Sequence, residues 1–233
     1  MTMRVIALAL IALLSLTDFA AAQMPGAPGQ LPAPDMTRRP RQKAAEATPP
    51  APADPRAAEV EQYFNSIRTL QARFVQNNPN GSVVHGTLYV RRPGRMRFEY
   101  DAPSQLKIVA DGTQVTMWDI QTKDFGQWPI GWTAASFLVK EPLALSGDLQ
   151  VDQVERSDGL LAVTMSQSRK PQEGRVIVRV SEAPMQLRGW SIIDNRGHRV
   201  DVALSDVKSG IQLADSLFKF DGPDPGQMRG GGN

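Results

Sequence analysis

Polar and apolar residues alternate along most of the chain between Leu70 and Phe220, as they do in β-strands that bury one face. Turn signals separate these runs, for example at 78–81 (Asn-Pro-Asn-Gly) and 158–159 (Asp-Gly). Because short turns join neighbouring strands, we expect an antiparallel meander that curls into an incomplete β-barrel, a mainly β half-barrel covered by a few lid helices. The predicted strands are 70–77, 83–92, 95–100, 106–110, 115–119, 125–128, 149–156, 160–167, 175–180, 187–194, 200–207 and 217–220.

A helix is predicted to begin at Asp54-Pro55, because Asp is a favoured N-cap and Pro suits the first helical position. The helix either packs on the sheet as an ordinary structural element or serves as a lid over a cavity, and its sequence is compatible with both roles. The apolar residues at helical spacing are Val60, Phe64, Ile67 and Leu70.

A second interruption of the strand pattern spans residues 127–147 and contains Trp128, Trp132 and Phe137. Residues 133–139 are expected to form one or two short helical turns with Thr133 as their cap. Exposed tryptophans are costly unless they cover apolar surface, so this segment is a second candidate lid.

Two strands joined at residues 91–94 carry the sharpest pattern in the chain. Side chains alternate along a strand, so Arg92 shares the apolar face of the first strand and stands at its rim, while Arg91 faces the opposite way and is expected to be solvated. We expect an apolar concave surface with Arg92 as a polar latch. The apolar residues on the shared faces are Leu88 and Val90 in the first strand and Met96, Phe98 and Tyr100 in the second.

The ends of the chain differ from the middle. Residues 1–22 have the basic, apolar and small-residue order of a secretory signal peptide with cleavage after Ala22, and their apolar run is too short for a membrane anchor. Residues 23–54 are rich in proline and are expected to be a disordered leader, whose basic cluster either contacts anionic lipid or is simply solvated. The folded domain is expected at 55–223, and a disordered tail at 224–233.

Composition narrows the range of possible functions. The chain has 26 basic and 24 acidic residues, and a net charge of +2 gives no reason to expect binding to nucleic acid. The absence of cysteine excludes disulfides and thiolate metal sites. The two histidines, His85 and His198, have no metal-binding spacing, and no catalytic motif is present, so we expect no catalytic residues, no metal and no cofactor. A periplasmic hydrolase is disfavoured for the same reason, and a module that binds an apolar ligand is favoured.

Several motifs together resemble the LolA family of periplasmic outer-membrane lipoprotein carriers. The block at 86–100 is the most specific of them, and Arg92 matches the family's arginine. Departures occur at 116–119 (Thr-Met-Trp-Asp) and 127–129 (Gln-Trp-Pro), where the family commonly has W-x-Y-D and Q-V-T. The motifs are L-x-A-R-F-V-Q at 70–76, G-x-L-x-V-x-R-P-G-R-M-R-F-E-Y at 86–100, Ala-Pro at 102–103, I-V-A-D-G at 108–112, D-N-R-G at 194–197 and F-K-F at 218–220.

The resemblance implies an incomplete barrel closed by helices. Its cavity would receive lipoprotein acyl chains from an ATP-driven inner-membrane extraction complex and pass them to an outer-membrane acceptor, with Arg92 bonding lid backbone to close the empty cavity. We predict a monomeric, non-catalytic periplasmic carrier, and the alternative is a half-barrel lipid or lipoprotein sensor in envelope regulation. The predicted cavity lining is Phe64, Ile67, Leu88, Val90, Met96, Phe98, Tyr100, Ile108 and Phe137.

Overall fold

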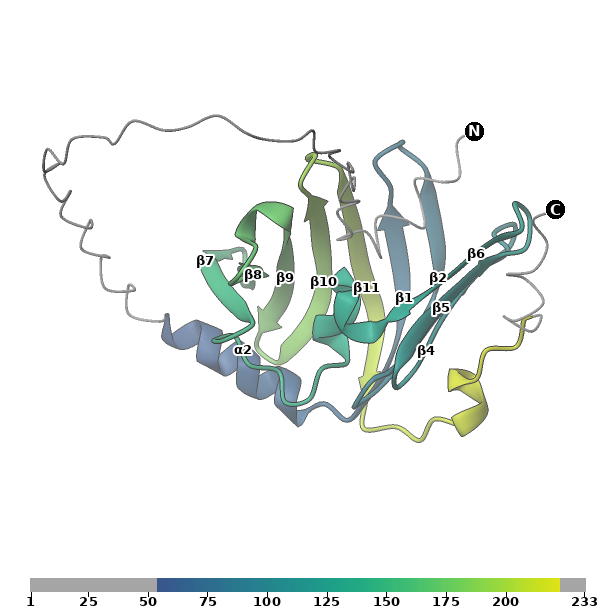
Figure 1. Cartoon of the computed structure of the whole chain (residues 1–233). Helices are drawn as coiled ribbons and strands as arrows, with labels where there is room; N and C mark the ends of the chain where they lie inside the picture. Colours follow the sequence, from purple (N-terminus) through teal and green to yellow (C-terminus); the bar gives the residue numbers. More distant parts are fainter. Residues whose placement is uncertain (1–53, 223–233) are drawn as a thin grey trace, which may run out of the picture. The chain divides into compact units, whose positions relative to one another are not determined.

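The computed structural model describes residues 54–222 of the 233-residue chain (Figure 1). These residues form one helix, eleven strands and four short 3-10 turns. The elements are α2 (Pro55–Ser66), β1 (Thr69–Asn77), β2 (Val83–Arg91), β3 (Arg95–Tyr100), β4 (Leu106–Asp111), β5 (Gln114–Asp119), β6 (Asp124–Pro129), η1 (Ile130–Trp132), η2 (Ala134–Leu138), β7 (Leu149–Ser157), β8 (Leu160–Gln167), η3 (Pro171–Glu173), β9 (Gly174–Glu182), β10 (Met185–Asp194), β11 (Arg199–Ser209) and η4 (Asp215–Phe218).

The strands form a single sheet in the order β6-β5-β4-β3-β2-β1-β11-β10-β9-β8-β7, in which neighbours are antiparallel. Strands β6 and β7 are the two edges and do not pair, so the sheet is not closed into a barrel. The predicted fold class, a mainly β half-barrel covered by helical segments, is confirmed.

The predicted single meander is wrong in one respect, because the first and last strands pair with each other. Strand β1 lies between β2 and β11, with Phe74 opposite Leu204. The sheet therefore consists of two meanders, β1–β6 and β7–β11, joined through β1 and β11. Short turns specify only sequential pairing, and this long-range pairing leaves no turn signal.

Helix α2 begins where the sequence predicted. The Asp54 carboxylate accepts a hydrogen bond from the Arg56 backbone N–H at 2.9 Å, and Pro55 is the first helical residue. The helix ends at Ser66, so Ile67 and Leu70 lie outside it although they continue its spacing, and Leu70 lies on β1, as the predicted strand 70–77 places it. In Figure 1, α2 runs along one end of the strands.

The segment 130–147 lies over the middle of the sheet, in front of β10 and β11 in Figure 1. Its turns η1 and η2 are 3-10 helices. Thr133 occupies the position before η2, but its hydroxyl donates to the Ile130 carbonyl at 2.9 Å and caps nothing in η2. Trp128, just before the segment, packs half-buried against the core, whereas Trp132 is 56% exposed, so only one of the two tryptophans covers apolar surface.

The predicted last strand at 217–220 is instead part of η4 and the chain that follows it. Residues 211–222, here called the C-terminal strap, lie on the outer face of the sheet. Phe218 is buried there with the Arg91 guanidinium 4.7 Å from its ring centroid, and the Leu217 carbonyl accepts a hydrogen bond from Arg97 at 3.4 Å. A strand needs a neighbour along its edge, and this segment crosses strands that already have both of theirs.

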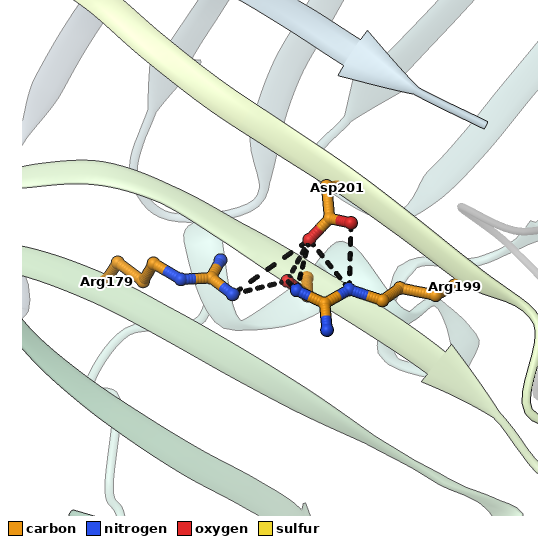
Figure 2. Close-up of polar contacts among 4 residues, drawn as sticks. Arg179, Arg199 and Asp201 are labelled. Atoms are coloured by element: carbon orange, nitrogen blue, oxygen red, sulfur yellow. Dashed lines mark hydrogen bonds and ion pairs between the residues drawn. The ribbon is translucent and has the colours of Figure 1, made fainter. Parts of the chain in front are cut away.

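The outer face of β9–β11 carries a polar network (Figure 2). Ser191 of β10 accepts hydrogen bonds from Arg179 of β9 at 2.9 Å and from Arg199 of β11 at 3.2 Å, and its hydroxyl donates to Asp201. Arg199 also pairs with Asp201 at 2.8 Å. The network links three adjacent strands on the face opposite the core.

The predicted signal peptide, its cleavage after Ala22, the proline-rich leader and the tail lie outside the described residues. The domain boundaries therefore stay predictions. Within residues 54–222, no helix is long and apolar enough to cross a membrane.

Candidate functional site

The inner face of the sheet and its two covers, α2 and the segment 130–147, enclose one continuous cluster of buried apolar side chains. All nine predicted lining residues belong to it, and none is more than 9% exposed. Helix α2 contributes Phe64, with Ile67 just after it, and η2 contributes Phe137. The sheet contributes the rest: Leu88 and Val90 from β2, Met96, Phe98 and Tyr100 from β3, and Ile108 from β4.

Aromatic rings connect the covers to the sheet. Phe137 meets Phe64 edge to face at 6.1 Å between centroids, so the two covers contact each other. Deeper in the cluster, Phe74 of β1 packs edge to face against Phe98 at 5.5 Å and Tyr100 at 5.2 Å. The covers thus fill the concavity of the sheet with side chains.

Gly86 makes room for the Phe74 ring. The two residues are paired across β1 and β2, and a Cβ atom on Gly86 would lie 2.6 Å from the ring. No side chain could occupy this position without displacing Phe74. The glycine that opens the 86–100 block therefore has a packing reason.

Arg92 reaches from the end of β2 to both covers. Its guanidinium donates hydrogen bonds to the Phe64 carbonyl at the end of α2 and to the Lys140 carbonyl after η2, with a weaker contact to Asn65 Oδ1 at 3.5 Å. The side chain is only 6% exposed. A single buried side chain therefore contacts backbone of both covers at once.

The electrostatics of Arg92 are unusual, because its bonded partners are neutral. Burial lowers the pKa of Arg92 to about 10, and the positive charge of Arg68 adds to this effect. Arg92 remains charged at neutral pH, but closing the covers over it carries a desolvation cost that offsets its hydrogen bonds. The closed arrangement is therefore held only weakly at this point.

Helix α2 is also bonded to the segment after η2. Asn65 donates to the Leu143 carbonyl at 2.9 Å and accepts from the Leu143 N–H at 2.8 Å. Glu61 accepts from the Leu145 N–H at 2.7 Å. On the other side of the helix, the Tyr63 hydroxyl accepts from the Leu187 N–H of β10 at 2.7 Å.

The end of the sheet away from Arg92 is more polar. Tyr100 donates a hydrogen bond to Gln76 at 3.2 Å, and burial raises the pKa of the Tyr100 hydroxyl well above its ordinary value. A surface pocket of about 540 Å³ opens at this end and shares Tyr100 and Leu106 with the cluster. The apolar interior thus adjoins the surface at the end opposite the Arg92 contacts.

The family model described as outer membrane lipoprotein carrier protein LolA matches residues 65–221. This chain belongs to the LolA family. The matched range contains the 86–100 block and every predicted lining residue except Phe64, together with the segment 130–147. The family that the sequence motifs resemble is therefore confirmed.

Relatives extend the match over most of the chain. A protein of Legionella pneumophila (strain Lens) named outer-membrane lipoprotein carrier protein is 31% identical over 176 residues, covering 72% of this chain and 86% of that protein. A protein of the same name from Methylococcus capsulatus (strain Bath) is 27% identical over 174 residues, covering 70% and 82%. Among solved structures, a LolA superfamily protein of Nitrosomonas europaea aligns with a TM-score of 0.41 at 12% identity, covering 71% of this chain and 98% of that one.

The sequence pattern did not predict that Trp190, the largest side chain of the apolar cluster, belongs to it. It is 0% exposed and packs edge to face against Phe137 and Phe98 at 5.9 and 6.3 Å. Strict alternation along 187–194 places Trp190 on the face opposite Leu187. A bulge between Leu187 and Gly189 adds one residue and brings both side chains to the inner face. Gly189, at φ +151°, was the available signal, because an interior glycine in a strand often marks a bulge.

Arg91 was also predicted incorrectly. Its side chain pairs with Asp215 at 2.5 Å, bonds the Leu213 carbonyl at 3.2 Å and covers the Phe218 ring. All three partners belong to the C-terminal strap, which the sequence did not place on this face.

The two histidines are both exposed, and residues 54–222 contain no group of three or more His, Asp or Glu side chains placed to hold a metal ion.

Proposed function

We propose that this protein is a periplasmic carrier that takes up the acyl chains of lipoproteins between its sheet and its covers and shuttles them from the inner to the outer membrane. Membership of the LolA family supports the carrier role. The structural observation that carries the proposal is the Arg92 arrangement, in which one weakly favourable buried side chain fastens both covers over an apolar cluster.

Transport of acyl chains requires a balance between binding the cargo and releasing it. Burial of each methylene is worth about 0.8 kcal/mol, so acyl chains do not cross an aqueous space uncovered. A carrier must therefore cover the chains and still release them. A closed state that competes with the cargo lowers the apparent affinity, because binding must first displace the covers.

In this proposal, Phe64 and Phe137 move away with their covers, and the chains take their places against Leu88, Val90, Met96, Phe98 and Ile108. Methionines such as Met96, Met117 and Met165 also line the cluster, and their flexible thioethers adapt to ligands of varied shape. The role requires no catalysis, metal or cofactor. The partners are an ATP-driven extraction complex at the inner membrane and an acceptor at the outer membrane, and the carrier works as a monomer.

The decisive experiment places a photo-crosslinking amino acid at Phe98, inside the cluster, and at Glu99, which is the next residue and exposed on the outer face. Acylated proteins are labelled with an alkyne fatty acid in cells. We expect crosslinks to acylated proteins from position 98 and not from position 99. Absence of acylated adducts from position 98 contradicts the proposal.

Directional transport has its own test. Inner-membrane vesicles should release a labelled lipoprotein to the carrier only with ATP, and the loaded carrier should then deliver it to outer-membrane vesicles. A stable complex with a membrane-bound regulator and no delivery would instead indicate the sensor.

A further inference from the structure

Trp190 carries a polar group that bonds nothing in the closed structure. Within residues 54–222, five side-chain nitrogen or oxygen atoms are buried without a hydrogen-bond partner, and one of them is the Trp190 indole nitrogen. The other four belong to Arg91, Arg92, Arg97 and Glu141. Each of these charged side chains forms at least one hydrogen bond or ion pair. The indole has only this one polar atom, so Trp190 is entirely unsatisfied.

The surroundings of Trp190 offer no good acceptor. Its ring lies between Phe98 and Phe137, each at an interplanar angle of 76°. An aromatic ring is a far weaker acceptor than a carbonyl oxygen. Buried donors are almost always paired, so an unpaired one inside an apolar cluster needs an explanation.

The buried Tyr100 and Gln76 of the inner face are paired, in contrast to Trp190. Tyr100 donates to Gln76 at 3.2 Å, and Gln76 in turn donates to Asn78 at 2.7 Å.

The backbone on both sides of Trp190 is fixed. Gly189 forms the bulge, and a Cβ atom there would lie 2.1 Å from the Val202 carbonyl oxygen, so no other residue fits. On the other side, Ser191 is tied to Arg179 and Asp201 in the outer-face network (Figure 2). The backbone that carries Trp190 is thus fixed, and its indole packs against Phe98 and Phe137.

We propose that the Trp190 indole N–H donates a hydrogen bond to an ester carbonyl oxygen of the carried lipid anchor, an inference that rests on the carrier function proposed above. Hydrocarbon offers no acceptor, whereas each of the two acyl chains on the glyceryl group ends in an ester carbonyl. Phe137 of the second cover lies directly against Trp190. When that cover moves, Trp190 is uncovered, and the ester carbonyls lie beside it while the chains extend into the cluster beyond.

The test uses the full-length mature protein and two synthetic peptides. One peptide carries an S-diacylglyceryl cysteine, and the other carries the dialkyl ether with the same chain lengths and no ester carbonyls. The wild type should bind the diester about fivefold more tightly than the diether, as expected for one neutral hydrogen bond. Trp190→Phe should bind the two peptides equally. Trp118→Phe, a half-buried tryptophan outside the cluster, should keep the preference.

A second measurement covers the case in which Trp190→Phe does not fold. The indole N–H signals of the wild type are followed by NMR, and the Trp190 signal is assigned by eliminating those lost in Trp118→Phe, Trp128→Phe and Trp132→Phe. The diester should move the Trp190 proton signal downfield, and the diether should not.

The outcomes separate the two proposals. Equal binding of both peptides by the wild type, the same Trp190 shift with both, or a preference that survives in Trp190→Phe overturns the role of Trp190 and leaves the carrier function standing. Failure of the wild type to bind either peptide overturns the carrier function itself.

Discussion

The two faces of the sheet are each covered, and adjacent arginines hold the two covers in different ways. Arg92 faces inward and bonds neutral carbonyls of α2 and the segment 130–147. Arg91 faces outward and pairs with the Asp215 carboxylate at 2.5 Å while lying over Phe218. The inner contact buries a cation without a bonded counter-charge, whereas the outer one combines an ion pair with a buried aromatic ring.

This difference indicates which cover is built to move. An unpaired buried charge costs free energy that offsets its hydrogen bonds, so Arg92 adds little net stability to the closed position of the inner covers. The strap buries a phenylalanine, and the Arg91 cation beneath it has a carboxylate counter-charge in Asp215. We therefore expect the strap to act as a permanent part of the fold and the inner covers to be displaceable.

The largest expected effect is on the strap. Phe218→Ala removes a ring that is 3% exposed and should lower the free energy of unfolding by about 3 kcal/mol. Chemical denaturation measures it. Phe220→Ala, at a half-buried residue of the same strap, is the control and should cost clearly less. A loss below 1 kcal/mol for Phe218→Ala would mean that the strap contributes little to the fold.

Phe137→Ala removes a ring of the inner covers that is also 3% exposed. It should increase binding of an apolar fluorescent dye, because the cluster beneath becomes accessible, whereas Phe218→Ala should not. Equal dye binding by both variants would contradict the distinction between a displaceable and a permanent cover.

The next effect concerns the bonds between the inner covers. Asn65→Ala leaves the Leu143 N–H and carbonyl without their partner and should lower the free energy of unfolding by about 1–2 kcal/mol. Gln62→Ala, at an exposed position of the same helix, controls for helix propensity. Amide hydrogen exchange at Leu143 should accelerate only in the Asn65 variant, and unchanged protection there argues that the covers are not joined by this side chain.

Replacing each of the two adjacent arginines in turn tests the difference between the two faces most directly. Arg92→Leu should change the free energy of unfolding by less than about 1 kcal/mol, because lost hydrogen bonds and relieved desolvation offset each other. The open state should become more populated, so a diacylglyceryl peptide should bind about fivefold more tightly and leave more slowly. Binding isotherms and dissociation rates measure both.

Arg91→Leu is the matched control. It should weaken the strap and leave peptide affinity unchanged. If Arg92→Leu simply unfolds, Arg92 is structural and the latch role fails. If both variants alter affinity equally, the two faces are not independent.

The smallest expected effect is a change in the pKa of the Asp215 carboxyl. The Arg91 guanidinium lowers the pKa of the Asp215 carboxyl below its ordinary value of 3.8. A lowered carboxyl pKa stabilises the folded state fully above the ordinary pKa, and this contribution is lost as the pH falls through the lowered pKa. NMR titration of the carboxyl carbon should show the pKa rising toward 3.8 in Arg91→Leu. Asp101, whose pKa is lowered by Arg73, should not change.

Local pattern predicted much of the fold. Alternation located eleven of the twelve predicted strands to within a few residues, and Asp54-Pro55 marked the start of α2. The same alternation placed Arg92 on the face of Leu88 and Val90, since side-chain direction along a regular strand follows from sequence position alone. The motifs around this strand pair also led to the right family.

Tertiary structure decided the rest, because it depends on contacts between residues far apart in the chain. The pairing of β1 with β11 gave no turn signal, and the bulge at Gly189 brings Trp190 to the same face as Leu187, which strict alternation would not do. Arg91, which was expected to be solvated, contacts the strap instead. Sequence alone thus determined which residues form strands and that Arg92 faces inward, and only the fold determined what each arginine holds and why an unpaired indole lies at the centre of the cluster.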